Sequence, residues 1–132
     1  MNFAQFHLST FGRYSEKTNN VPFLSTIVEV ILDNYAEIGW LSKELKAAHD
    51  FSGGGNATYI VAEGADAILS HVYSNLPEVT INRSVLASLL EDFYHLTTKK
   101  TPEIYVIEEN GKFTVTDKPT PEIEKYLKSR KT

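Results

Sequence analysis

The fold is decided by the stretch Ile81–Thr116, which reads INRSVLASLLEDFYHLTTKKTPEIYVIEENGKFTVT. Its first half predicts a helix over residues 83–97. Asn82 is a good N-terminal cap, because its side chain can accept hydrogen bonds from the free N–H groups of the first helical turn. Apolar residues then recur at helical spacing and form a stripe wide enough to face a core. The members of this stripe are Val85, Leu86, Leu89, Leu90, Phe93 and Leu96.

The second half of the stretch predicts a β-hairpin. Residues 103–108 alternate between apolar and polar side chains and are rich in Ile, Tyr and Val, and residues 112–116 alternate back. Between them lies Asn110-Gly111, the strongest short hairpin signal, because a type I′ turn needs positive φ at both of its central residues. We therefore expect an antiparallel strand pair after the helix.

Patterns on either side of this stretch predict the remaining elements. Residues 65–76 fit a helix through Ile68, Val72 and Leu76, but their alternation also fits a strand, and both readings stay open. Trp40 suits a strand within a segment that otherwise favours a helix. Two segments are expected to be loops, residues 12–20 and 50–56. The other predicted elements are a weak strand near residues 3–9, helices over 22–35 and 38–49, a strand over 57–63 and a last helix over 121–130.

This order of elements favours an α+β fold. Scattered single strands and a terminal hairpin predict an antiparallel or mixed sheet, with the hairpin packed against three to four helices. The length of 132 residues fits a single globular domain over residues 1–132, and a hydrophobic content of 42% is enough for a core without disulfides.

Composition excludes several classes of protein. The chain has no cysteine, which rules out a disulfide framework, thiol catalysis and cysteine-bound zinc, and which suits the cytoplasm. Residues 1–5 show no basic region leading into an apolar run, so no signal peptide is expected. No apolar stretch approaches the roughly 20 residues that a membrane span needs. We therefore expect a cytoplasmic protein that does not contact the membrane.

The charge balance argues against direct nucleic-acid binding. The formal net charge is −4, whereas a protein that wraps nucleic acid shows a basic excess. The basic residues that cluster, within 125–131, are expected to form a solvated end of the chain. A mildly acidic domain is compatible with a basic protein partner.

The glycine run at residues 51–56, FSGGGN, is the most conspicuous loop. A phosphate-binding loop needs a helix immediately after its glycines, and the segment that follows here is a predicted strand. The run also lacks a Gly-Lys-Ser/Thr ending, so it is neither a P-loop nor a dinucleotide fingerprint. A turn is the favoured interpretation, and a binding loop is the alternative. Asp50 beside it offers too few carboxylates for calcium.

No catalytic motif is present. The four histidines show no i, i+3 or i, i+4 pair, and no G-x-S-x-G sequence occurs. We therefore expect no cofactor, no metal and no enzymatic activity. The alternative is a small enzyme whose site assembles only in three dimensions, and its candidate residues are His71, His95, Glu63, Asp66 and Asp92.

Aromatic residues interleaved with carboxylates favour a protein-binding function. Tyrosine is enriched in interface hot spots, and surrounding carboxylates steer a basic partner. Tyr94 is the best outward-facing candidate, since it lies at the flank of the apolar stripe. The predicted partner-binding residues are Asp50, Tyr59, Glu63, Asp66, Glu91, Asp92 and Tyr94.

Two segments, residues 50–61 (DFSGGGNATYIV) and 81–94 (INRSVLASLLEDFY), together with size and acidity, resemble bacterial immunity proteins. These antidotes are encoded beside polymorphic and contact-dependent growth-inhibition toxins. The resemblance implies tight binding to a cognate toxin, often a basic nuclease, by covering its active site or an adjacent surface. It implies no role for any single residue. The free protein is expected to be a monomer or a weak homodimer, and a structural or adaptor subunit of a complex is a further alternative.

Overall fold

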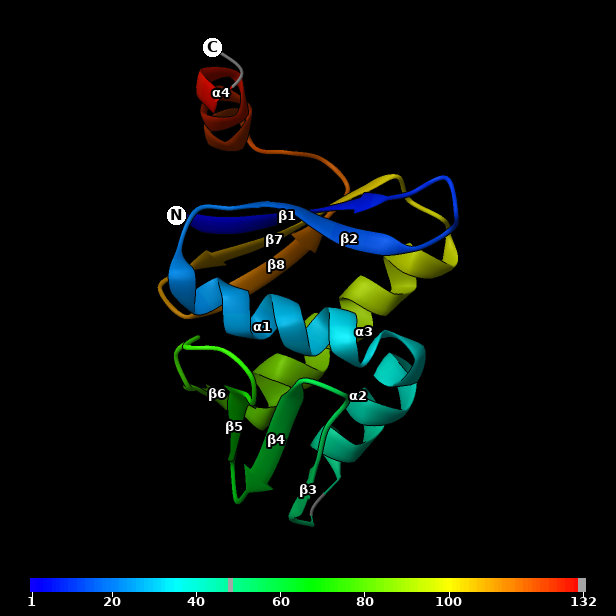
Figure 1. The fold of residues 1–132 in the computed structure, drawn as a ribbon, viewed down its shortest axis with the longest axis vertical. Helices are drawn as coiled ribbons and strands as arrows, with labels where there is room; N and C mark the ends of the chain where they lie inside the picture. The colour runs from blue at the N-terminus through cyan, green and yellow to red at the C-terminus, as the bar shows by residue number, and fades with distance from the viewer. Residues whose placement is uncertain (48, 131–132) are drawn as a thin grey trace.

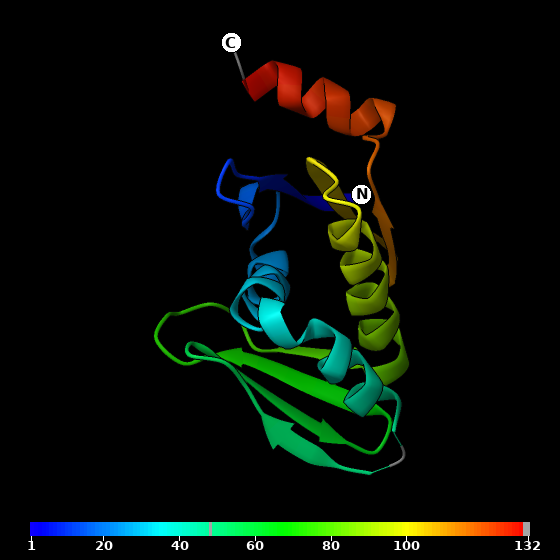
Figure 2. The ribbon, with the colours of Figure 1, turned by 90° about the vertical axis from the view of Figure 1, so that its right-hand side faces the viewer.

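Two four-stranded antiparallel sheets enclose three helices in the computed structural model, which describes residues 1–47 and 49–130 (Figure 1). The helices between the sheets are α1 (Pro22–Asp33), α2 (Ile38–Lys46) and α3 (Arg83–Thr98). Figure 2 shows the same layering from the side, with one sheet above these helices and the other below. The predicted α+β class is therefore confirmed.

The first sheet joins the two ends of the chain. Its strands lie in the order β2-β1-β7-β8, so β1 pairs with β2 on one side and with β7 on the other. Helix α4 (Pro121–Arg130) covers its outer face, where Ile123 packs against Phe3, Tyr105 and Ile107. The strands are β1 (Asn2–Leu8), β2 (Tyr14–Asn19), β7 (Glu103–Glu109) and β8 (Lys112–Thr116).

The second sheet is built from one continuous part of the chain. Its order is β3-β4-β5-β6, and each strand pairs with the next in sequence. The helices cover one face of this sheet; among the described residues, no element covers the other face (Figure 2). The strands are β3 (Phe51–Gly53), β4 (Thr58–Glu63), β5 (Asp66–His71) and β6 (Val79–Asn82).

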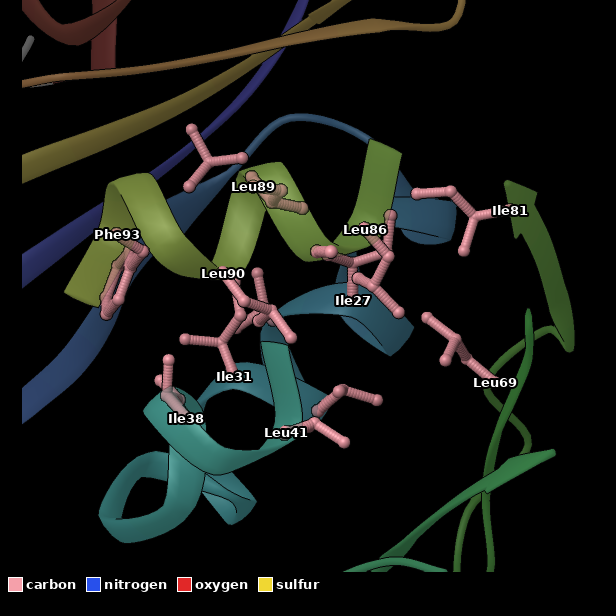
Figure 3. Close-up of a cluster of buried hydrophobic side chains, with 14 of the residues drawn as sticks. Ile27, Ile31, Ile38, Leu41, Leu69, Ile81, Leu86, Leu89, Leu90 and Phe93 are labelled. Atoms are coloured by element: carbon pink, nitrogen blue, oxygen red, sulfur yellow. The ribbon is translucent and has the colours of Figure 1, made fainter. Parts of the chain in front are cut away.

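The main core lies between the sheets. Ile31 of α1, Ile38 of α2 and Leu90 of α3 meet there, and Leu69 and Ile81 close it from the second sheet (Figure 3). The apolar stripe of α3 faces this core as its spacing predicts, and the Asn82 side chain caps the helix by accepting from the N–H groups of Ser84 and Val85.

Several predicted elements are confirmed. The hairpin β7–β8 turns at Asn110 and Gly111, whose φ angles of 53° and 81° are the positive values that a type I′ turn needs. Helix α4, the N-terminal strand and strand β4 also form where expected. The predicted helix over 22–35 ends at Asp33, and a short 3₁₀ turn, Tyr35–Glu37, leads into α2.

Other expectations were wrong. The strands form two sheets where one was expected, although the antiparallel alternative is confirmed for the described strands of both sheets. The predicted loop over 12–20 contains β2, the predicted loop over 50–56 contains β3, and β6 was not predicted at all. Residues 65–76 form a strand only as far as His71, so the helical spacing of Ile68, Val72 and Leu76 has no structural counterpart.

The helix predicted over 38–49 ends at Lys46. Ala48, which that prediction includes, and Lys131, which ends the basic run at 125–131, lie outside the described residues. The last turn of α2 carries Lys43 and Lys46, the charge that suits a helix C-terminus.

Candidate protein-binding surface

The predicted partner-binding residues fall into two groups. Tyr59, Glu63 and Asp66 lie in strands of the second sheet and Asp50 directly precedes β3, whereas Glu91, Asp92 and Tyr94 lie on α3. Glu91 lies eight residues beyond the start of α3 at Arg83, which is about 12 Å along the helix axis. The structure therefore offers two candidate surfaces.

We call the uncovered side of the second sheet the open face. Alternate residues of a strand point to opposite sides, so the exposed parity of each strand defines it. Tyr59 is directly opposite Ser70, Val61 opposite Ile68 and Glu63 opposite Asp66. The residues of the open face are Ser52, Tyr59, Val61, Glu63, Asp66, Ile68, Ser70, Thr80 and Asn82.

The open face has an apolar centre and an acidic end. Val61 and Ile68 are half-buried at its centre, and Tyr59 beside them remains 45% exposed. Glu63 and Asp66 flank the β4–β5 turn at one end. Asp50 joins them there, because its Oδ1 accepts a hydrogen bond of 2.9 Å from the N–H of Gly64 in the same turn. Three of the predicted carboxylates thus lie together at the β4–β5 end of the open face.

The segment that builds this sheet carries the whole negative excess of the protein. Residues 50–82 contain no lysine or arginine; their acids are Asp50, Glu63, Asp66 and Glu78. The other 13 acids of the chain are matched by its 13 basic residues, so the formal charge of −4 resides in this segment. A count of charges along the sequence reveals this run, although no motif marks it.

The group on α3 is partly neutralised. The Lys46 ammonium of α2 forms an ion pair with the Glu91 carboxylate. Tyr94 is 46% exposed, as predicted, and its ring lies over Gly39 of α2. Asp92 lines a shallow groove that Lys112 also lines. Lys46 and Lys112 accompany these carboxylates. At the open face the Arg83 guanidinium lies 3.7 Å from Asp50, but Glu63 and Asp66 form no ion pair among the described residues, so the open face is the better surface for a basic partner.

The residues of the alternative enzymatic site are not brought together. His71 is paired with Thr58, at the end of β5 opposite to Asp66 and Glu63. Its Nε2 lies 4.0 Å from Glu29 of α1 instead. His95 and Asp92 are exposed on α3. Within residues 1–47 and 49–130, no three histidine or acidic side chains are placed to hold a metal ion.

The glycine loop binds an anion of the chain itself. The Asp33 carboxylate, at the end of α1, accepts hydrogen bonds from the N–H groups of Asn56, Ala57 and Thr58 and from the Thr58 hydroxyl, at 2.7–3.0 Å. At Gly55 a Cβ would lie 2.4 Å from Asp33 Oδ2. The favoured interpretation of the run as a turn is wrong for residues 51–53, which form β3; the Asp33 carboxylate holds the connection that follows, through the N–H groups of Asn56, Ala57 and Thr58.

This environment shifts the acidity of Asp33. Burial acts to raise the pKa of its carboxyl, but the hydrogen bonds from Ala57, Thr58 and Asn56 outweigh burial and lower the pKa below its ordinary value of 3.8. A lowered folded-state pKa contributes stability above the unfolded value, and this contribution is lost as the pH falls through the folded value.

We predict that Asp33→Asn lowers the free energy of unfolding by about 1–3 kcal/mol at pH 7, because a neutral amide accepts these hydrogen bonds less strongly and offers one acceptor oxygen in place of two. Urea denaturation measures the loss. The difference from the wild type should shrink below about pH 4, as the wild-type carboxyl becomes protonated. Asp117→Asn, at an exposed site, is the matched control. Equal losses in both variants would contradict the role of the loop.

Arg83 is the structural residue that sequence reasoning missed. Its side chain is buried and donates hydrogen bonds to five backbone carbonyls, and its guanidinium lies 5.7 Å from the ring centroid of Phe51. Its hydrogen bonds connect the C-terminal end of α2 with the residue segment before β3 and with the β4–β5 turn. The five acceptors are the carbonyls of Glu44, Leu45, Ala47, His49 and Gly64.

No protein-family model, curated protein or solved structure matches this chain. Among the described residues, no helix combines the length and the apolar character needed to cross a bilayer. The functional argument therefore rests on the surface itself.

Proposed function

We propose that this chain is an antidote, or immunity, protein that neutralises a basic protein toxin by docking it on the open face. The observation that carries the proposal is the open face itself: a sheet surface left uncovered by the rest of the described chain, with an exposed tyrosine, an acidic end and no lysine or arginine in the segment that builds it. A nuclease is the expected toxin, since an enzyme that binds polyanions presents a basic surface.

The open face supplies both an apolar contact and a negative potential, which such a complex needs. Tyr59, with Val61 and Ile68 beside it, provides an apolar anchor of the kind that carries most of the binding energy at interfaces. Asp50, Glu63 and Asp66 provide a negative potential that accelerates association with a basic partner and disfavours acidic ones. The proposal includes the cytoplasm as the place of action and a monomer or weak homodimer as the free state.

Co-expression with the product of the neighbouring gene tests this function. We expect the two proteins to co-purify, the toxicity of the partner to disappear, and the association rate to fall steeply between low and physiological salt. A neighbouring product that neither binds this chain nor is neutralised by it would refute the proposal.

A further inference from the structure

A small pocket lies between α2 and β3, on the helix side of the second sheet. Its volume is about 210 Å³, below the roughly 300–1,000 Å³ of sites for small molecules, and so it suits a single side chain. Leu41 and Ile60 contribute apolar lining, and Trp40 and Phe51 contribute aromatic rings. Trp40, the single tryptophan of the chain, remains 58% exposed although it lines a pocket.

Two polar side chains of this pocket, Glu37 and Asn34, offer acceptor oxygens, and a third, Ser52, carries a hydroxyl that can donate or accept. Glu37 lines it, and its carboxylate has no ion-pair or hydrogen-bond partner among the described residues. Asn34 also lines it and is only 8% exposed. The Asn34 amide nitrogen donates to the Val30 carbonyl and to the Thr58 hydroxyl, which leaves Oδ1 accessible and without a donor in the described part of the chain. No lysine or arginine lines the pocket.

Gly53 gives an independent sign that the space is kept for a ligand. Gly54 must be glycine, because a Cβ there would lie 2.0 Å from the Thr58 carbonyl oxygen. A Cβ on Gly53 would meet nothing within 4 Å, and its φ is not positive, so the fold does not require a glycine at this position. Gly53 is opposite Ile60, whose side chain faces the helices, so a side chain at 53 would enter the pocket. Glycine inside a strand marks a bulge, a bend, or the close approach of a ligand or of another backbone, and the open space beside Gly53 fits a ligand.

We infer that this pocket binds the guanidinium group of an arginine side chain from the protein partner. An aromatic ring attracts a cation over its face, and the weakly hydrated, planar guanidinium stacks on it more readily than an ammonium does. The Arg83 guanidinium already lies 5.7 Å from the ring centroid of Phe51, so Trp40 is the ring on which a guanidinium from the partner would stack. Glu37 would neutralise its charge, and Asn34 Oδ1 would accept one of its N–H groups. The inference rests on the proposed function and deepens it. The pocket lies beside the edge strand β3, and Ser52 of the open face also lines it, so a partner docked on the open face reaches the pocket by extending past that edge.

Trp40 provides a direct reporter, since no other tryptophan contributes to the fluorescence of the chain. The probe is acetyl-Gly-Arg-Gly-amide, and its neutral isostere is acetyl-Gly-citrulline-Gly-amide. We expect a saturable change in Trp40 emission with the arginine peptide at millimolar concentration, at least tenfold weaker with citrulline, and weaker with the lysine analogue. An equal response to arginine and citrulline, or a tighter response to lysine, would overturn the assignment.

Three variants localise the response. Gly53→Leu should abolish it, because leucine fills the pocket, and Glu37→Gln should weaken it at least fivefold while leaving the fold intact. Tyr73→Ala, an exposed aromatic outside the pocket, is the matched control and should bind as the wild type does. Undiminished binding by folded Gly53→Leu or by Glu37→Gln would refute the site.

The peptide titration uses only the free chain, so its outcome is independent of the toxin. If the arginine peptide does not bind but the neighbouring gene product is still neutralised, the pocket assignment fails and the proposed function stands. If the peptide binds but the neighbouring gene product is not neutralised, the pocket assignment stands and the proposed function fails.

Discussion

Replacing Arg83 by methionine is expected to lower the free energy of unfolding by about 3–5 kcal/mol, the largest effect of any single substitution proposed for this chain. Methionine keeps much of the buried volume but removes all five hydrogen bonds to the carbonyls of residues 44, 45, 47, 49 and 64. A carbonyl that loses its donor away from water, such as that of Leu45, whose bond to Arg83 is buried, costs desolvation energy. A domain of this kind has only about 5–15 kcal/mol in total, so the variant should be close to unfolding.

Denaturation in urea measures this loss, and Arg13→Met is the matched control. Arg13 lies exposed in the β1–β2 connection, so its replacement should change stability by no more than about 0.5 kcal/mol. Arg83→Lys should recover little, because one ammonium cannot reproduce the planar set of donors. If Arg83→Met unfolds at the same urea concentration as Arg13→Met, the anchoring role is wrong.

The double variant Glu63→Lys/Asp66→Lys is expected to weaken the complex with the proposed toxin at least about a hundredfold, which corresponds to about 2.8 kcal/mol. Both side chains are exposed and lie opposite each other at the β4–β5 turn. Replacing two like charges by two others keeps their mutual repulsion, so the stability of the free protein should not change. The acceleration of association at low salt should disappear or reverse.

The control for this charge reversal is Glu122→Lys/Glu124→Lys. It changes the net charge by the same amount, but its exposed residues lie in the first turn of α4, on the outer face of the first sheet (Figure 1). Calorimetric titration of the toxin into each purified variant measures the dissociation constant of the complex. Equal weakening by the two double variants would mean that only overall charge matters, and the open face would then not be the docking surface.

The elements that could be predicted from the sequence carry their signals within a few residues. Helix α3 combines a cap at Asn82 with an apolar stripe over four turns, and hairpin β7–β8 needs only Asn110-Gly111 between two alternating strands. Strand β3 has three residues and β6 has four, which is too short for a period to be recognised. Their conformation is set by pairing within the second sheet.

The same distinction applies to the surface. Tyr59, Glu63 and Asp66 were predicted from residue type, yet only the strand register shows that they share one face. Arg83 looks like an ordinary first-turn residue, because all five of its acceptors lie 19 or more positions earlier in the chain. The Asp33 contact with the glycine loop is equally invisible, since 23–25 residues separate the partners.

The pairing of β1 with β7 has a consequence for how fast the chain folds. Asn2 and Glu108 are 106 positions apart and hydrogen-bond across this pair, whereas β4 and β5 meet through a two-residue turn. Closing a longer loop costs more chain entropy, by about 0.6 kcal/mol for each doubling of length, and non-local contacts slow folding. The second sheet therefore consists of local strand pairs that form rapidly. We expect the pairing of β1 with β7, which completes the first sheet, to limit the folding rate.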